Sequence, residues 1–134
     1  MRIGLISDLH ANRQALTACL EHGRTRHIDQ WAVLGDLVGY GADPVWVLEQ
    51  VMAMADQGAV VLAGNHDHMA LKPVKSDQLG AMTAQWTHDQ LSAEHKAFLR
   101  SLPLTHEIED ALLVHASADE PQAWKYVDDP RAAA

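Results

Sequence analysis

The sequence has one cysteine, no long hydrophobic run and few basic residues, and each shortage excludes a class of protein. A single cysteine, Cys19, cannot form an internal disulfide, so a cytoplasmic location is the simplest expectation. No apolar run approaches the ~20 residues that cross a bilayer, and the first residues become polar too soon for a signal peptide. With 10 Lys and Arg against 18 Asp and Glu, the net charge is −8. This balance argues against general nucleic-acid or membrane-surface binding, which needs a basic footprint.

The length and composition are those of an ordinary globular domain. The 134 residues are 48% hydrophobic and 21% charged, without a repeat or linker, so we expect one domain over residues 1–134. Strands are expected at 3–7, 31–34 and 59–63, helices at 12–25, 43–57, 77–90 and 93–101, and a hairpin at 105–108 and 111–114. This alternation predicts an α/β fold with a largely parallel sheet and right-handed crossovers.

Local signals mark the ends and inner faces of the expected helices. Asp43 followed by Pro44 is typical of a helix start, Ser92 is a second candidate N-cap, and Gly58 suits the position after a helix end. The apolar spacing predicts inward-facing side chains at Leu16, Cys19 and Leu20, at Val45, Leu48, Val51, Met52 and Ala55, and at Leu79, Met82 and Trp86.

Three polar blocks stand directly after the three expected strands, at residues 8–10, 35–39 and 64–67. The carboxyl ends of neighbouring parallel strands meet at one edge of a sheet, where open α/β folds bind ligands. We therefore expect Asp8, His10, Asp36, Asn65 and His66 to gather at that edge. Oxygen and imidazole ligands that converge in one place indicate a site for divalent transition metals, here two of them.

The first two blocks suit the ligands of such a centre. Asp8 and His10, two residues apart on extended backbone, share a face and can reach one cation. The two carboxylate oxygens of Asp36 can bridge two ions. Gly35 and Gly39 allow the backbone to turn tightly beside Asp36.

The later residues add a neutral oxygen, a catalytic candidate and another imidazole. Asn65 offers an amide oxygen to the second ion, and its neutrality leaves net positive charge for an anionic substrate. His66 is interpreted as facing the substrate, where it donates a proton to a leaving oxygen or hydrogen-bonds a phosphoryl oxygen. Asp67 would then orient His66. His115 ends the apolar run 111–114 and so arrives at a strand end like the others.

Taken singly, these patterns have plainer explanations. Asp8 and His10 alone could be a turn that caps itself, and a Gly-Asp-x-x-Gly block is often only a turn. His115 alone could be a buried histidine with its hydrogen bonds satisfied. The three blocks together, each after a strand, favour the metal site over these explanations. The remaining histidines are expected at surfaces or caps, with His68 the nearest to the blocks.

The blocks together resemble a known family signature. Asp8-x-His10, Gly35-Asp36-x-x-Gly39 and Gly64-Asn65-His66-Asp67 look like the calcineurin-like metallophosphoesterases, most closely the small bacterial branch, and Val114-His115 resembles the next ligand block. The resemblance implies a dinuclear centre in which Asp8, His10 and Asp36 hold one ion and Asp36, Asn65 and His115 hold the other. It also implies manganese, iron or zinc as the ions, and hydrolysis of a phosphoester by in-line attack on phosphorus, with His66 assisting.

One departure from that signature concerns the C-terminal side. The family's Gly-His-x-His block, whose two histidines complete the two metal sites, is absent from this sequence. The resemblance therefore implies a truncated single domain: a sandwich of mixed β-sheet and flanking helices whose second sheet is incomplete. Metal occupancy should then be incomplete and retention weaker. The alternative is a catalytically weak or inactive protein of this fold that acts as a binding or regulatory module.

The expected partners follow from this interpretation. The substrate is a small-molecule phosphoester, and neither nucleic acid nor a membrane is a general partner. The expected strands are apolar on both faces, so an incomplete second sheet would leave one face uncovered. We therefore expect a homo-oligomer, most simply a two-fold dimer that buries these faces or edges.

Overall fold

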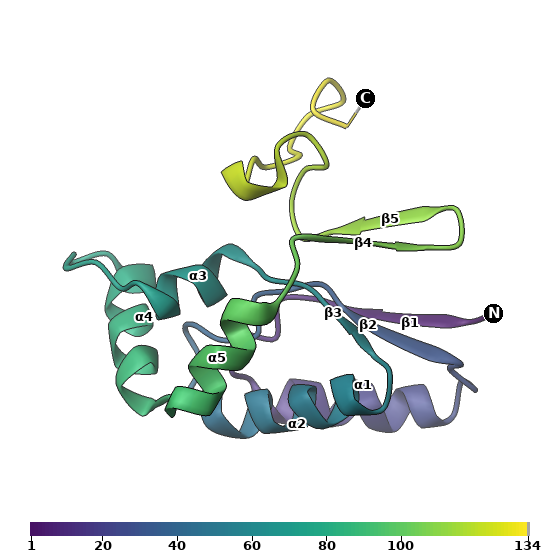
Figure 1. The fold of residues 1–134 in the computed structure, drawn as a ribbon, viewed down its shortest axis with the longest axis horizontal. Helices are drawn as coiled ribbons and strands as arrows, with labels where there is room; N and C mark the ends of the chain where they lie inside the picture. The colour runs from purple at the N-terminus through teal and green to yellow at the C-terminus, as the bar shows by residue number, and fades with distance from the viewer. Residues whose placement is uncertain (134) are drawn as a thin grey trace.

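Strands and helices alternate along the first part of the chain, as expected (Figure 1). The computed structural model describes residues 1–133. The elements are β1 (Ile3–Ile6), α1 (Arg13–Arg24), β2 (Gln30–Val33), α2 (Pro44–Asp56), β3 (Val60–Val61), α3 (Asn65–Leu71), α4 (Leu79–Gln90), α5 (Ala93–Ser101), β4 (Thr105–Ile108), β5 (Ala111–Val114) and the short 3-10 helix η1 (Pro121–Ala123).

The first three strands form a parallel sheet in the order β1-β2-β3, with Ile3 paired to Gln30 and Ala32 to Val60. Helices α1 and α2 lie together on one face of this sheet (Figure 1). Buried side chains such as Leu16, Val33 and Leu48 fill the space between the two layers. This core fixes the sheet and therefore the loops at its carboxyl edge.

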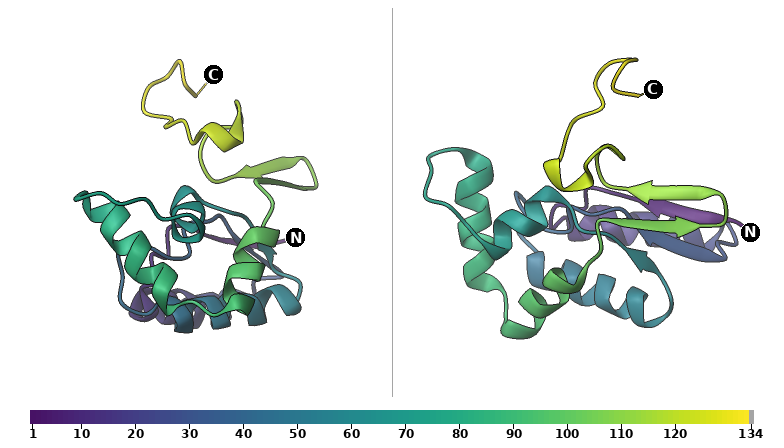
Figure 2. Two further views of the ribbon diagram at one scale, coloured as in Figure 1. Left: turned by 60° about the vertical axis from the view of Figure 1, so that its left-hand side comes forward. Right: turned by 45° about the horizontal axis from the view of Figure 1, so that its top comes forward.

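The β4–β5 hairpin covers the opposite face of the sheet. Its two strands are antiparallel, and Figure 2 shows them as a separate layer. Ile108 and Leu113 of the hairpin pack with Ala32 and Leu62 in a second, smaller core. The fold is therefore the predicted mixed α/β sandwich, in which the second sheet consists of two strands within residues 1–133.

The helix-end signals are confirmed in large part. Asp43 is the N-cap of α2 and Pro44 its first residue, although the Asp43 side chain makes no capping hydrogen bond. Gly58 follows α2 with φ of 95°, the left-handed conformation that favours glycine after a helix. The Ser92 hydroxyl accepts the N–H of His95 at 3.2 Å at the start of α5.

Helix α3 is not predicted by the sequence, because seven residues without an apolar stripe carry no helical periodicity. Contacts with Asp36 and Asp67 form its first turn instead. Oδ2 of Asp67 accepts the N–H of Gly64 at 2.9 Å, and Oδ1 of Asp36 accepts the N–H of His66 at 2.8 Å. Gly64 has no side chain with which to cap the helix, so Asp36 does this from a neighbouring loop.

The prediction of which side chains of α4 face the core is wrong. Its large apolar side chains are exposed: Leu79 by 67%, Met82 by 56% and Trp86 by 44%. The buried side chains of this helix are small, namely Ala81, Ala84 and Thr87. Helix α4 packs against α3 and α2, and small side chains let helices approach closely. Periodicity alone assigns the large residues to the core, whereas the actual packing uses the small ones.

In α1, Leu16 is buried as expected, but Cys19 is exposed. The indole of Trp31 packs between β1 and α1. A Cβ atom on Gly23 would lie 2.3 Å from the Trp31 ring, and one on Gly4 would lie 2.7 Å from it. Glycine at these two positions therefore makes room for the tryptophan.

The sheet face that was expected to be uncovered is covered in part, because the hairpin packs over Ala32 and Leu62. Leu5 of β1 points to the same side and is 56% exposed. The open apolar surface thus lies at the β1 side of the sheet. Within residues 1–133, no helix has the length and hydropathy to cross a membrane.

Candidate metal centre

The loops that follow β1 and β2 lie side by side because backbone hydrogen bonds continue past the ends of the strands. The N–H of Asp8 donates to the carbonyl of Gly35 at 3.1 Å, and that of His10 donates to the carbonyl of Asp36 at 2.9 Å. This pairing places Asp8, His10 and Asp36 at one edge of the sheet. The predicted gathering of side chains at the carboxyl edge is present.

The backbone that brings these side chains together is not extended. Asp8, His10 and Asp36 have φ of 56°, 43° and 52°, in the left-handed region that non-glycine residues rarely adopt. The expected extended geometry at Asp8 and His10 is therefore wrong, although the two side chains do converge. Such conformations carry a free-energy cost and cluster at functional sites, where they aim side chains that regular structure would point elsewhere.

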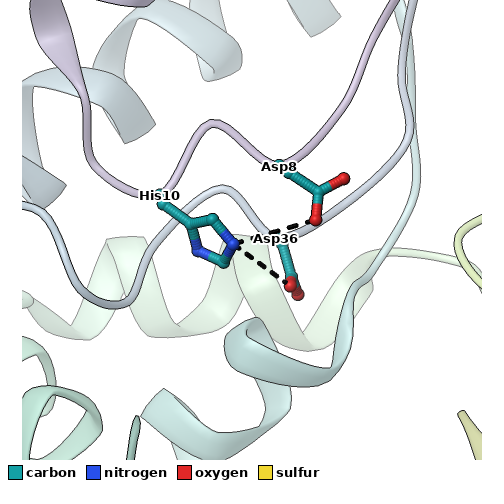
Figure 3. A group of neighbouring side chains, drawn as sticks. All are labelled: Asp8, His10 and Asp36. Carbon is teal, nitrogen blue, oxygen red and sulfur yellow. Dashed lines mark ion pairs between the residues drawn. The ribbon is translucent and has the colours of Figure 1, made fainter. Parts of the chain in front are cut away.

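Asp8, His10 and Asp36 form a group of three potential metal ligands (Figure 3). Their ligand atoms all lie within 4.8 Å of one another. Nε2 of His10 is 3.8 Å from Oδ1 of Asp8 and 3.6 Å from Oδ2 of Asp36. Nδ1 of His10 donates to the carbonyl of Val38 at 3.1 Å, which leaves Nε2 free to bind a cation.

His115 and Asn65 stand on the other side of Asp36. Nε2 of His115 is 3.1 Å from Oδ1 of Asn65 and 3.5 Å from Oδ1 of Asp36. Nδ1 of His115 donates to the carbonyl of Leu34 at 2.6 Å, so its ring is oriented by the backbone, as metal-binding histidines commonly are. The other four predicted ligands thus lie around Asp36, and the oxygen and imidazole donors of the five fit Mn²⁺, Fe²⁺ or Zn²⁺.

Asp36 and His115 form a coupled acid–base pair in the absence of a metal. Burial alone would raise the pKa of Asp36, but His115 and the backbone N–H of His66 outweigh burial and lower it. The Asp36 carboxylate, helped by the Leu34 carbonyl and opposed by burial, raises the pKa of His115 to about 9. A negative charge is therefore stable at the centre of the group, as a cation site requires.

His66 is buried beside this group, at the start of α3. Its ring centroid lies 5.0 Å from that of His10. Burial lowers the pKa of His66, and the rings of His10 and His115 act in the same direction, whereas Asp36 opposes them. Its Nδ1 atom is buried and has no hydrogen-bond partner in residues 1–133. Packing therefore holds this ring, not a hydrogen bond at Nδ1.

Asp67 does not orient His66, contrary to expectation. Its side chain is fully buried, and its carboxylate accepts the backbone N–H groups of Leu37 at 2.9 Å, Val38 at 3.2 Å and Gly64 at 2.9 Å. Burial raises the pKa of Asp67 to about 7, against the opposing effect of these hydrogen bonds. Asp67 thus ties the loop after β2 to the start of α3, because a buried backbone N–H needs an acceptor.

Two aromatic residues next to the site escape the sequence analysis. Tyr40, directly after the block that follows β2, contacts the rings of His10 and His66. Trp124, beyond η1, lies edge to face with His68 and His115, at centroid distances of 5.1 and 6.0 Å. Tyr40 could have been noticed because it directly follows Gly39. No sequence signal connects Trp124 with residues that lie far from it along the chain.

Two hollows flank the centre. One of about 750 Å³ is lined by the loop after β1, the first turns of α1 and residues 40–43, and it includes Asp8, His10 and Tyr40. A smaller one of about 210 Å³ is lined by Asp8, Asn65, His115 and residues 124–127. Four candidate ligands, Asp8, His10, Asn65 and His115, therefore face open space, whereas Asp36 is buried between them.

Known proteins are similar to this chain in sequence or in fold. The chain is 36% identical over 132 residues to the uncharacterized protein MJ0912 of Methanocaldococcus jannaschii, a match that covers 93% of this chain and 53% of that protein. A metallophosphoesterase from Sphaerobacter thermophilus matches in structure with a TM-score of 0.79 and 37% identity, over 95% of this chain and 51% of that one. The hypothetical protein PH1004 from Pyrococcus horikoshii OT3 shares the fold, with a TM-score of 0.77 and 23% identity, over 89% and 56% of the two chains.

The chain thus spans about half the length of the relatives it matches. The sequence model of the calcineurin-like phosphoesterases matches residues 1–129, which contain all five candidate ligands. The order of the three blocks, their place at the sheet edge and this match agree. The chain belongs to the calcineurin-like phosphoesterase family.

Proposed function

We propose that this chain binds two divalent ions and hydrolyses a phosphoester, either a monoester or a diester. The observation that carries the proposal is the position of Asp36, whose Oδ2 is 3.6 Å from His10 and whose Oδ1 is 3.5 Å from His115. A carboxylate between two imidazoles can serve two ions at once. Asp8, His10 and Asp36 would hold one ion, and Asp36, Asn65 and His115 the other.

Manganese, iron and zinc are the ions that suit these donors. When bound, such ions act as Lewis acids toward a phosphoryl oxygen. The protein's own part is to bring the phosphoester to this edge of the sheet. Asn65 contributes no charge, so the loaded site keeps a positive charge that attracts an anionic substrate.

His66 is the proposed catalytic residue. Its Nδ1 is buried without a partner, so Nε2 is the nitrogen through which the ring can reach a bound phosphoester. From there His66 donates a proton to the leaving oxygen or a hydrogen bond to a phosphoryl oxygen. Asp67 supports this role only through the backbone, because its carboxylate bonds to N–H groups around the start of α3.

A binding or regulatory module with little activity is the second proposal. It is supported by the small set of metal donors in the part of the chain that the structure describes. Among the described residues, Asp8, His10 and Asp36 are the one group of three His, Cys, Asp or Glu side chains whose ligand atoms lie close together. A chain that retains its metal weakly would keep its fold but would hydrolyse phosphoesters slowly.

One experiment separates the two proposals. The protein is purified without chelator, its metal content is measured by mass spectrometry, and turnover of bis(4-nitrophenyl) phosphate and 4-nitrophenyl phosphate is followed with added Mn²⁺. Metal-dependent turnover that is lost in Asp36→Asn supports the hydrolase. Bound metal without turnover of either ester supports the binding module. A protein that neither binds metal nor hydrolyses either ester would contradict both proposals.

The partner and the cellular location of the protein are proposals as well. The partner is a small-molecule phosphoester rather than a nucleic acid, since Asp and Glu outnumber Lys and Arg by 18 to 10. The single cysteine favours the cytoplasm. Fractionation of expressing cells with an antibody to the chain tests the location.

A further inference from the structure

The His66 ring is held in an unusual way for a catalytic histidine. Such rings are commonly oriented by a hydrogen bond from one nitrogen to a carboxylate or carbonyl. Here the Nδ1 atom is buried and unpartnered within residues 1–133, and the neighbouring carboxylate of Asp67 is committed to backbone N–H groups. The orientation of the ring must therefore come from the surfaces that pack against it.

One of these surfaces is the backbone of Gly39. A Cβ atom at this position would lie 2.9 Å from Nδ1 of His66 and 3.2 Å from its Cβ and Cγ. Gly39 also has φ of 90°, so both space and backbone conformation require glycine. The close approach of Gly39 blocks one side of the imidazole.

A second surface is the phenol ring of Tyr40. Its centroid lies 4.6 Å from that of His66 at an interplanar angle of 48°, and 5.0 Å from that of His10 at 68°. His10 and His66 are themselves 5.0 Å apart at 88°. Each of the three rings thus contacts the other two, at distances at which aromatic pairs attract.

Tyr40 reaches this place at a cost. Its φ of 60° is left-handed, which is uncommon for a bulky residue, and its side chain is 49% exposed although it is large and mostly apolar. A left-handed backbone and an exposed apolar surface each carry a free-energy cost. Both are explained if the ring is needed beside His66, since strained residues that the fold does not require mark functional positions.

We propose that Tyr40 is a positioning residue that keeps the His66 ring in its working orientation by packing against it. This inference rests on the proposed hydrolytic role of His66. The aromatic face is the active feature and the hydroxyl is not, because the contacts join ring to ring. Phenylalanine should therefore replace tyrosine, whereas leucine should not.

The kinetic test uses Tyr40→Phe, Tyr40→Leu, His66→Ala and the double variant Tyr40→Leu/His66→Ala. Leucine is not β-branched, so it bears the same left-handed backbone without a new clash. The expected result for Tyr40→Leu is a fall in kcat of about 3- to 10-fold, which corresponds to one aromatic contact, with KM for bis(4-nitrophenyl) phosphate unchanged. Tyr40→Phe should keep the full kcat.

The double variant decides whether Tyr40 acts through His66. If it does, Tyr40→Leu has no further effect on kcat once His66 is alanine. An equal fall in kcat in both backgrounds would overturn the proposal, as would a loss in Tyr40→Phe equal to that in Tyr40→Leu. Loss of bound metal in Tyr40→Leu would also overturn it, because Tyr40 would then act through His10.

A second measurement does not depend on activity. In the metal-free protein, the ring protons of His66 are assigned by NMR, with His66→Ala identifying the signals. The Tyr40 ring should shift these signals, so Tyr40→Leu moves them and Tyr40→Phe does not. Unchanged His66 signals in Tyr40→Leu would overturn the inference even if the wild type hydrolyses phosphoesters. Shifted signals without turnover in any variant would uphold the packing and contradict the proposed function alone.

Discussion

The backbone N–H of His66 donates a 2.8 Å hydrogen bond to Oδ1 of Asp36, which joins the first turn of α3 to the loop after β2. The same carboxylate faces His10 and His115. Asp36 is thus both a proposed bridge between two ions and the acceptor for the helix that carries Asn65. Metal binding and the local fold are connected through this one side chain.

We expect Asp36→Asn to remove more bound metal than any other single substitution in the site, because Asp36 alone is shared by the two proposed ligand sets. His66→Ala should instead keep its metal and lose rate by roughly 10²–10⁴-fold, the range of a general acid–base group. Metal content by mass spectrometry and initial rates on one protein preparation check both expectations.

The matched control for Asp36→Asn is Asp77→Asn, the same change at an exposed position outside the site. Asp77→Asn should keep both metal and rate. Metal loss in His66→Ala as large as that in Asp36→Asn would contradict the division of roles between the two residues.

The wild-type protein should hold less than two equivalents of metal, and its activity should rise with excess Mn²⁺. Within residues 1–133, each proposed ion has three protein ligands, of which only one is an imidazole: His10 in one set and His115 in the other. Mn²⁺ stands at the weak end of the Irving–Williams order and is the easiest of the candidate ions to lose. Two ions that survive dialysis against a chelator would show that further residues complete the two proposed sites.

Asp67→Asn should destabilise the fold by about 1–3 kcal/mol, because an amide nitrogen would face a buried backbone N–H that the carboxylate now accepts. Asp67 is fully buried and serves three such groups. Urea unfolding followed by circular dichroism gives the free energy, with Asp77→Asn as the exposed control. A free energy of unfolding equal to the control's would show that these hydrogen bonds contribute nothing net.

Gly23→Ala should cost about 1–3 kcal/mol, the usual penalty for overpacking, since its Cβ would lie 2.3 Å from the Trp31 ring. The same substitution in a Trp31→Leu background should cost little, because the smaller side chain removes the clash. Thermal unfolding of the four proteins completes the double-mutant cycle. If Gly23→Ala destabilises the protein equally with and without Trp31, the contact with Trp31 is not the cause of the loss.

The protein should form a dimer at micromolar concentration. Leu5 is 56% exposed on the sheet face that the hairpin leaves open, and β1 is an edge strand. A second copy could cover this surface. Light scattering of the wild type and of Leu5→Lys tests the proposal, with Val74→Lys, a change at another exposed apolar residue, as control. A monomeric wild type, or a dimer that persists in Leu5→Lys, would contradict it.

The positions of the five candidate ligands could be predicted from the sequence because each follows an apolar run. Short apolar runs separated by helical periodicity indicate a parallel sheet, and a parallel sheet brings the ends of its strands to one edge. The hairpin at 105–108 and 111–114 was predicted at its observed bounds for a similar reason, since both its strands and its turn are local. The sequence alone was therefore enough to locate the blocks at Asp8, Asp36 and Asn65 at the edge of the sheet.

Apart from α3 and η1, the sequence by itself therefore determined the order of the elements, the edge where the site lies and the residues that meet there, because local periodicity and connectivity decide these. Only the tertiary structure decided what holds those residues in place. The pairing of the Asp8–His10 loop with the Asp36 loop, the capping of α3 by Asp36, the hydrogen bonds of Asp67 to backbone N–H groups and the packing of Tyr40 on His66 all join segments distant in the chain. Such contacts depend on which surfaces fit together in space, and no pattern along a single segment records that fit.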